Sequence, residues 1–251
     1  MKILLTNDDG INSIGIKILA EKLCKNHTVY VFAPSDQKSA CSQSLTVHST
    51  FGYKQIQWTG IEKTISVEGT PSDCVKLATK HFSLQPDLVI SGPNEGSNLG
   101  TDILYSGTVA GAMEGAICGF KSIAISQCGR LRNPSKLIDY IYDNLDELYK
   151  YNFEDSILNI NYPDCENSEI QGIKITKMGK TNYSDRYEHF QIEGKSTYKL
   201  VGRILQHDDN AEDCDTKLSQ HNYITITPLK LDRTEYQAYE MVKNLKLKNW
   251  N

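Results

Sequence analysis

The chain has 251 residues, of which 39% are hydrophobic and 23% are charged, and its formal net charge is −4 at pH 7. This length and apolar content suit one large domain with a full core, and the negative charge argues against a nucleic-acid partner. Seven scattered cysteines without a C-x-x-C pair favour reduced thiols over a disulfide framework or a zinc site.

The sequence gives no indication of a membrane partner. The N-terminus enters an apolar strand and a turn directly, without the charged-then-apolar pattern of a signal peptide. The most apolar window, residues 103–125, contains Glu114 and Lys121, which a membrane span would exclude. We therefore expect a cytoplasmic protein.

Apolar strands and amphipathic helices alternate from the N-terminus onward. In chain order we expect a strand at residues 1–7, a helix at 14–24, a strand at 28–33, short strands at 46–48 and 64–67, and a helix at 70–81. Thr70 can cap the last of these helices, and Pro71 suits its first position.

The same alternation continues in the second half of the chain. We expect strands at residues 87–91, 122–126, 157–161 and 222–228, and helices at 107–118, 135–149 and 234–247. Between residues 164 and 220 the pattern is polar, with strand fragments at 172–176 and 198–205. The alternation predicts an α/β fold with a doubly wound, mostly parallel sheet.

Two adjacent carboxylates, Asp8 and Asp9, follow the first strand. Ligands of open α/β sheets bind at the carboxyl ends of the strands, so both side chains are expected in the binding crevice. Two carboxylates placed there repel each other unless a proton or a cation lies between them. The pair therefore suggests a bound divalent metal ion.

A glycine-rich loop runs over residues 91–100 and continues into 105–109. Ser106, Gly107 and Thr108 begin a predicted helix, whose free amides and positive dipole end form an anion site. Glycines then recur every four residues, and for Gly111, Gly115 and Gly119 we expect close packing of the helix on the sheet.

A metal site can be assembled from three loops at one edge of the sheet. They offer Asp8, Asp9, a hydroxyl from the loop 35–44 and the side-chain carbonyl of Asn94. An all-oxygen set suits Mg²⁺ or Mn²⁺ better than zinc or copper. Spacing alone does not choose among the serines of that loop, which are Ser35, Ser39, Ser42 and Ser44.

The ordered motifs resemble those of the SurE family of metal-dependent 5′-nucleotidases. They are Asn7-Asp8-Asp9-Gly10, Ser39 in its loop, Gly69-Thr70-Pro71-Ser72-Asp73-Cys74, Ser91-Gly92-x-Asn94-x-Gly96-x-Asn98-x-Gly100 and Tyr105-Ser106-Gly107-Thr108-Val109. The match covers residues 1–130 and recurs at 159–163 and 224–229. Two features depart from the family: Pro93 replaces an aliphatic residue, and residues 183–215 lack the aromatic-glycine pattern of the family's arm.

The resemblance implies a ligand set and a role for each residue. Asp8 and Asp9 would be catalytic, and one Mg²⁺ or Mn²⁺ ion per subunit would be held by Asp8, Asp9, Ser39 and Asn94. The phosphate would be held by Asn98, Ser106, Gly107 and Thr108.

The resemblance also implies an architecture. A Rossmann-like three-layer α/β/α catalytic core would span residues 1–165. A β-hairpin oligomerisation arm, a returning strand and a C-terminal helix exchanged between subunits would span residues 166–251, giving a homodimer or homotetramer.

The expected reaction is hydrolysis of nucleoside 5′-monophosphates to nucleoside and phosphate; whether 3′-nucleotides and short polyphosphate are also hydrolysed stays open. One alternative is a Mg²⁺-binding, receiver-like phosphoacceptor module, which needs an aspartate at the end of a later strand that residues 88–91 do not offer. Another is a dinucleotide-binding protein, but G-x-G-x-x-G does not follow the first strand.

Overall fold

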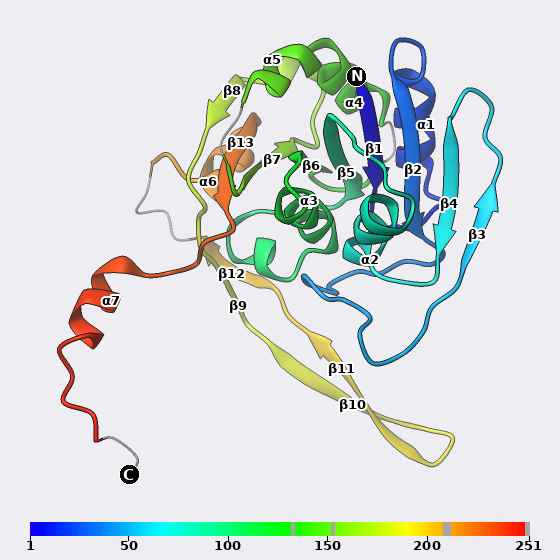
Figure 1. Ribbon diagram of the computed structural model, residues 1–251. Coiled ribbons are helices and arrows are strands. Elements are labelled where there is room, and N and C mark those ends of the chain that lie inside the picture. The colour runs from blue at the N-terminus through cyan, green and yellow to red at the C-terminus, as the bar shows by residue number, and fades with distance from the viewer. Residues whose placement is uncertain (132–133, 152–153, 208–211, 249–251) are drawn as a thin grey trace.

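A computed structural model describes residues 1–131, 134–151, 154–207 and 212–248. Its centre is a nine-stranded sheet of order β3-β4-β2-β1-β5-β6-β7-β13-β8 (Figure 1). The strands are β1 (Lys2–Thr6), β2 (Thr28–Pro34), β3 (Tyr53–Ile56), β4 (Lys63–Val67), β5 (Leu88–Glu95), β6 (Lys121–Gln127), β7 (Ser156–Tyr162), β8 (Gly172–Ile175) and β13 (Tyr223–Lys230). The six strands from β4 to β7 in this order run parallel. Strand β3 pairs antiparallel with β4, and β13 pairs antiparallel with β7 but parallel with β8. The predicted mostly parallel sheet is confirmed.

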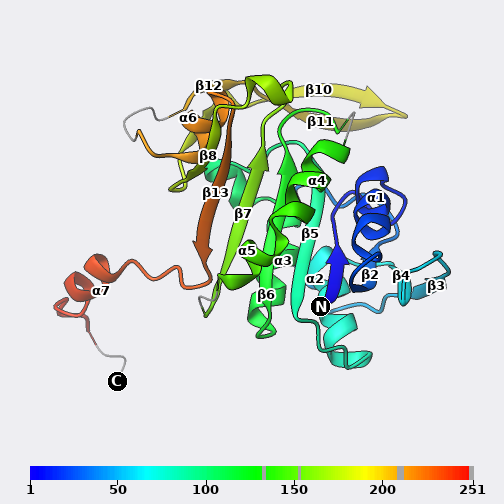
Figure 2. The same ribbon diagram turned by 90° about the horizontal axis from the view of Figure 1, so that it is seen from above.

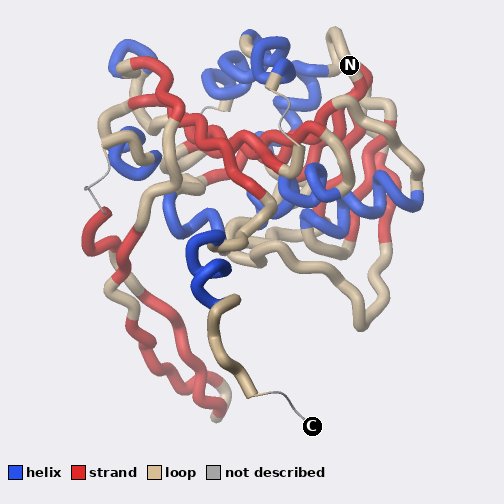
Figure 3. The backbone as a smooth tube through the Cα atoms, turned by 60° about the vertical axis from the view of Figure 1, so that its left-hand side comes forward, coloured by secondary structure: helices blue, strands red, loops and turns tan. Residues whose placement is uncertain are grey.

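Helices cover both faces of the sheet (Figures 1 and 3). The helices α1 (Ile14–Leu23), α4 (Ser135–Asp143) and α5 (Leu145–Lys150) pack on one face, and α2 (Pro71–Lys76), the π-helix η1 (Leu77–His81) and α3 (Gly107–Ile117) pack on the other. Along β1, Ile3 and Leu5 face the first layer and Leu4 faces the second. This alternation is what a strand buried on both faces requires, and it gives the predicted three layers.

Four local predictions need correction. Residues 46–48 form no strand, because the backbone N–H and hydroxyl of Thr46 both donate to the Asp73 carboxylate (3.0 and 2.7 Å). The predicted helix at 135–149 is two helices that meet at Asn144, and the predicted strand at 198–205 is interrupted at residues 202–203. A short helix, α6 (Asp215–Gln220), lies in the region where only strand fragments were expected.

Two segments of the C-terminal third extend away from the sheet. The strands β10 (Arg186–Ile192) and β11 (Lys195–Val201) form an antiparallel hairpin arm, whose base is the pair β9 (Thr181–Tyr183) and β12 (Ile204–His207) (Figures 1 and 2). The helix α7 (Tyr236–Val242) stands apart and has no buried residue. Within the described ranges, no helix has both the length and the apolar character needed to cross a bilayer.

Small residues bring α3 close to the sheet. A Cβ atom added at Gly111 would lie 2.7 Å from Ser91 Oγ, and one added at Gly115 would lie 2.9 Å from Val89 Cβ and closer still to Ser122 Oγ. The predicted packing role is confirmed for these two glycines. It is wrong for Gly119, which has open space around it and a φ of +91°, because it ends the helix in the left-handed conformation.

We expect the substitution Gly115→Ala to destabilise the fold by about 1–3 kcal/mol, because the added methyl group overpacks the α3–sheet contact. Thermal unfolding should show a fall in Tm of roughly 2–4 °C per kcal/mol for a chain of this size. Adding Ser122→Ala to the variant removes the hydroxyl that the methyl group meets first, so it should restore part of the loss. A double variant no more stable than Gly115→Ala alone would contradict this account.

Candidate active site

Three loops meet at the carboxyl edge of the sheet, as the sequence predicted. Asp8 and Asp9 follow β1, the loop 35–44 follows β2, and Asn94 lies at the end of β5. Backbone groups join the loops directly: Lys38 N–H donates to the Asp8 carbonyl (2.7 Å), and Glu95 N–H donates to Asp9 Oδ2 (3.2 Å). The parallel register of β2, β1 and β5 therefore assembles the site.

Asp8 is buried at the N-terminal end of α3. The Thr108 hydroxyl donates to its Oδ1, and the backbone amides of Gly107 and Thr108 also hydrogen-bond to the carboxylate. Burial raises the pKa of Asp8 above its ordinary value, and these hydrogen bonds act in the opposite direction. A Cβ atom at residue 107 would lie 2.8 Å from Asp8 Oδ2 and 2.9 Å from Cys41 Sγ, so glycine is required there.

The first turn of α3 is consequently satisfied within the protein. Asp8 accepts from Gly107 and Thr108, the Ser106 hydroxyl accepts from Val109 N–H (3.0 Å), and the Ser106 carbonyl accepts from Ala110 N–H (3.1 Å). The expected anion site at this helix end is thus used to hold a carboxylate of the chain itself. The positive end of the helix dipole still faces the same region.

Asp9 lies beside Asp8 and is less buried. Its Oδ2 accepts from Glu95 N–H, and Gln37 lies at hydrogen-bonding range of its Oδ1 (3.5 Å). Burial, with a smaller contribution from the charges of Asp8 and Glu95, raises the pKa of Asp9 to about 6. Near neutral pH the negative charge of these two carboxylates is therefore incompletely compensated by the protein. A divalent cation bound between them would compensate it.

Asn94 and the serine loop present neutral oxygens. Asn94 Nδ2 donates to the Gly96 carbonyl (2.7 Å), which directs the amide oxygen to the opposite side. In the loop, Ser35 donates to Asp36 (2.8 Å) and Ser44 hydrogen-bonds to Cys41, whereas Ser39 is exposed.

The loop is anchored on both sides of Ser39. Lys38 is bound to Asp8, and Ser42 N–H donates to the Tyr105 carbonyl (2.9 Å). In the described part of the chain, no three His, Cys, Asp or Glu side chains gather as a metal site, so an ion bound here needs neutral oxygens beside the two carboxylates.

Asn98 is built into the interior of the glycine-rich loop. Its N–H donates to Asn161 Oδ1 (2.8 Å), its carbonyl accepts from Asn159 and Asn161 Nδ2 (2.8 and 3.0 Å), and its side-chain amide donates to Ser126 Oγ (2.8 Å). The side-chain amide carries a second hydrogen. Among the described residues this second hydrogen has no acceptor, so Asn98 fixes the loop and keeps one donor for a ligand.

The family model for survival protein SurE matches residues 3–185. The chain belongs to the SurE family. It is 38% identical to the 5′-nucleotidase SurE of Natranaerobius thermophilus, over 97% of this chain and 98% of that protein. It is 40% identical to the 5′-nucleotidase SurE of Clostridium botulinum strain 657, over 98% and 99% of the two chains. The predicted family is confirmed.

A solved structure supports the fold independently. The crystal structure of the SurE protein from Aquifex aeolicus matches with a TM-score of 0.81 and 38% identity, covering 97% of this chain and 98% of that chain. The predicted Rossmann-like α/β fold is confirmed by this SurE structure.

Sequence reasoning missed Asp215, which holds the glycine-rich loop from the C-terminal side. This buried carboxylate accepts from Gly100 N–H (3.1 Å) through Oδ2, and from Gly179 and Thr216 N–H (both 2.7 Å) through Oδ1. Asp215 lies in the first turn of α6, and its place before Thr216 in a polar stretch is a helix-start signal that could have revealed this element.

The base of the hairpin arm contacts the same loop. Tyr183 donates to Asp102 (2.6 Å), and Thr101 donates to the Thr181 carbonyl (3.1 Å). Together with Asp215, these bonds join residues 100–102 of the candidate active site to β9.

We expect Asp9→Asn to stabilise the metal-free protein at neutral pH. The pKa of Asp9 is 3.8 without the fold's influence and about 6 in the fold, so above pH 6 the folded state bears the cost of a desolvated charge. That cost disappears as the pH falls below about 4, where the carboxyl is protonated.

In EDTA at pH 7.5, the free energy of unfolding of Asp9→Asn should exceed that of the unmutated chain by roughly 1–2 kcal/mol. At pH 4 the two proteins should be about equally stable. Chemical unfolding at both pH values measures this, with Asp36→Asn, an exposed carboxylate in the next loop, as the control. An equal effect at both pH values would refute the assignment.

We expect Asp215→Asn to release Gly100 selectively. The amide oxygen can replace Oδ1 toward Gly179 and Thr216, but the amide NH₂ would then meet the Gly100 N–H, donor against donor. An unsatisfied buried N–H costs about 1–3 kcal/mol.

Phosphatase activity should fall more steeply than this stability loss explains at temperatures where the variant is fully folded. Asp213→Asn is the matched control. Asp213 lies two residues before Asp215 and forms an exposed ion pair with Lys177. Full activity in folded Asp215→Asn would show that the contact does not matter to the site.

Proposed function

We propose that this chain hydrolyses nucleoside 5′-monophosphates to nucleoside and phosphate, using one divalent cation, Mg²⁺ or Mn²⁺, held by Asp8, Asp9, Ser39 and Asn94. The chain is a 5′-nucleotidase of the SurE family, and the cation and its ligands are the proposal. The observation that carries it is the pair of desolvated carboxylates at the sheet edge, where burial raises the pKa of Asp9 to about 6.

The donor set fits a hard cation. Two carboxylates, the amide oxygen of Asn94 and a loop hydroxyl are ligands that Mg²⁺ and Mn²⁺ prefer. The Asn94–Gly96 bond supports this assignment because it fixes which end of the amide is the acceptor. A cation bound there would polarise a phosphoryl oxygen and lower the pKa of a bound water.

The two aspartates would have different parts in the reaction. Asp8 is committed to Thr108 and α3, so it supplies a fixed negative charge. Asp9 is less buried than Asp8, so its carboxylate can reach the attacking water and take its proton.

The substrate phosphate would lie between this pair and the tip of α3. We assign Asn98, Ser106, Gly107 and Thr108 to the phosphate side of the site. In the part of the chain that the structure describes, one amide hydrogen of Asn98 has no acceptor, and the α3 dipole favours negative charge that develops in the transition state. Because these contacts do not depend on which ribose hydroxyl carries the phosphate, 3′-nucleotides and short polyphosphate are secondary substrates to assay.

The C-terminal third supports the proposed oligomer. We assign residues 1–165 to the catalytic core and 166–251 to the arm, the returning strand and a helix exchanged in a homodimer or homotetramer. Tyr236, Met241 and Leu247 on and after α7 are all more than half exposed, and such apolar groups are typical of surfaces that contact another chain.

All seven cysteines are free thiols, which suits the cytoplasm that we propose as the compartment.

We expect Asp8→Asn and Asp9→Asn each to lower phosphate release from AMP by at least about 100-fold, because each removes a charge that positions the cation and the water. The assay uses saturating Mn²⁺, with EDTA as the zero point. Mn²⁺ should also raise the Tm of the unmutated chain and have less effect on both variants.

Asp36→Asn, which keeps the site carboxylates intact, should behave as the unmutated chain does. Near-normal turnover in both site variants would contradict the proposal. A stable aspartyl phosphate without turnover would instead favour the receiver-like alternative.

A further inference from the structure

The N-terminal half of α3 presents two opposite sides to two different environments. Successive helical residues are about 100° apart, so residues 106, 109, 110 and 113 lie on one side and 107, 108 and 111 lie on the other. The second side contacts Asp8 and β1. The first side lines a cavity of about 320 Å³. Both sides begin at the same helix tip, at Ser106.

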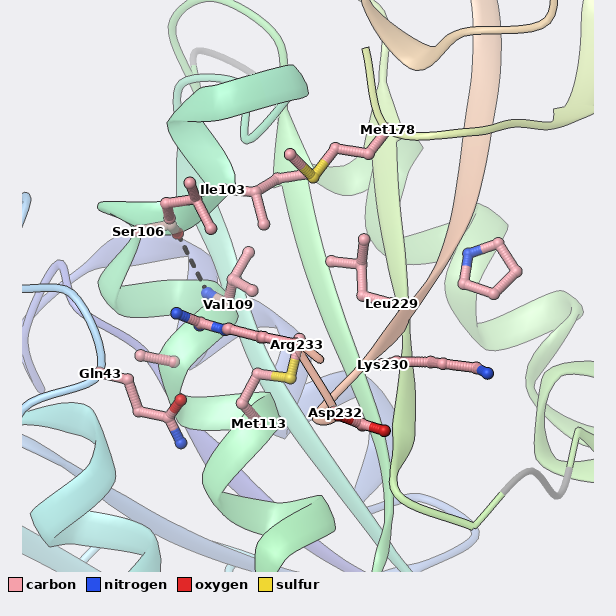
Figure 4. Close-up of a pocket in the computed structure, with 13 residues that line it drawn as sticks. Gln43, Ile103, Ser106, Val109, Met113, Met178, Leu229, Lys230, Asp232 and Arg233 are labelled. Atoms are coloured by element: carbon pink, nitrogen blue, oxygen red, sulfur yellow. Dashed lines mark hydrogen bonds between the residues drawn. The ribbon is translucent and has the colours of Figure 1, made fainter. Parts of the chain in front are cut away.

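The cavity has apolar walls and a polar rim (Figure 4). Ile103, Met113, Met178 and Leu229 line the walls. Its volume lies at the lower end of the range of small-molecule sites, and apolar walls with a few polar groups are typical of such sites. Flexible, polarisable methionine side chains suit contact with a flat aromatic ring.

Two polar side chains from distant segments complete the rim. Gln43 comes from the same loop as Ser39, and Arg233 comes from the segment after β13. Figure 4 shows the Arg233 side chain running across the cavity beside Val109. The neighbouring carboxylate of Asp232 is turned to Thr234 N–H (2.8 Å) and the Tyr236 hydroxyl.

We propose that this cavity binds the nucleoside of the substrate, with the base between the methionine wall and the Arg233 guanidinium. The inference rests on the proposed function, since a phosphate at the tip of α3 places the attached nucleoside beside Ser106. A planar guanidinium stacks on aromatic rings, and an amide such as that of Gln43 both donates and accepts hydrogen bonds at a base edge. Arg233 and Met178 are thus residues that set specificity for nucleotides over simpler phosphomonoesters.

The test compares AMP with ribose 5-phosphate, which carries the same phosphate and sugar without the base. Met178→Trp fills the cavity from a partly exposed position, and Arg233→Ala removes the stacking group. Lys230→Ala is the matched control, because Lys230 borders the same cavity but extends to its other side (Figure 4). Adenosine binding to the metal-free proteins is measured by calorimetry, independently of turnover.

We expect KM for AMP to rise roughly tenfold in both cavity variants with kcat little changed, which is the mark of lost ground-state binding. Values for ribose 5-phosphate should stay within about twofold, and adenosine should bind only the unmutated chain and Lys230→Ala. An unchanged KM for AMP in both variants, or equal losses for both substrates, would overturn the nucleoside site. Adenosine binding without phosphate release from either substrate in Mn²⁺ would support the site and overturn the proposed hydrolysis.

Discussion

The structure depends on placing the charge of Asp8 at the N-terminal end of α3. A carboxylate that is only 6% exposed needs compensation, and here the compensation comes from Thr108 and two amides of the first helical turn. This contact requires glycine at residue 107 and sets the distance between α3 and β1, which Gly111 then maintains along the helix. The same Asp8–α3 contact therefore determines both how the helix packs on the sheet and how the site residues are arranged.

Hydrogen bonds from other elements hold the backbone of the glycine-rich loop in place. Glycines make the loop permissive, yet Asn98 is held by two asparagines of β7 and Gly100 by Asp215 of α6. Hydrogen bonds from buried side chains to these backbone groups favour one conformation and offset the chain entropy that is lost when the loop is ordered. The C-terminal third thus contributes directly to the order of a site whose proposed ligands all lie in the first hundred residues.

Local and periodic signals made much of the fold predictable. The strand before Asp8, the Thr70–Asp73 capping box and the start of α3 are encoded within a few residues, and strand ends of a parallel sheet converge by topology. The role of Asp215 could not be predicted, since its partner Gly100 is 115 residues away. Thr46 was misassigned for a related reason, because Asp73 competes for the hydrogen bonds a strand would use. The ligand set itself remains a prediction.

The segment that follows β13 connects the cavity beside α3 to the helix α7. Lys230, Asp232 and Arg233 border the cavity beside α3, and the segment leads into the helix that stands apart from the sheet. The Asp232 carboxylate bonds to Thr234 and Tyr236, so the segment and the start of α7 share one conformation. A contact that fixes α7, such as one with a second subunit, would therefore also fix the position of Arg233. Nucleoside recognition and assembly would then depend on the same few residues, although the proposed cation site lies on the other side of α3.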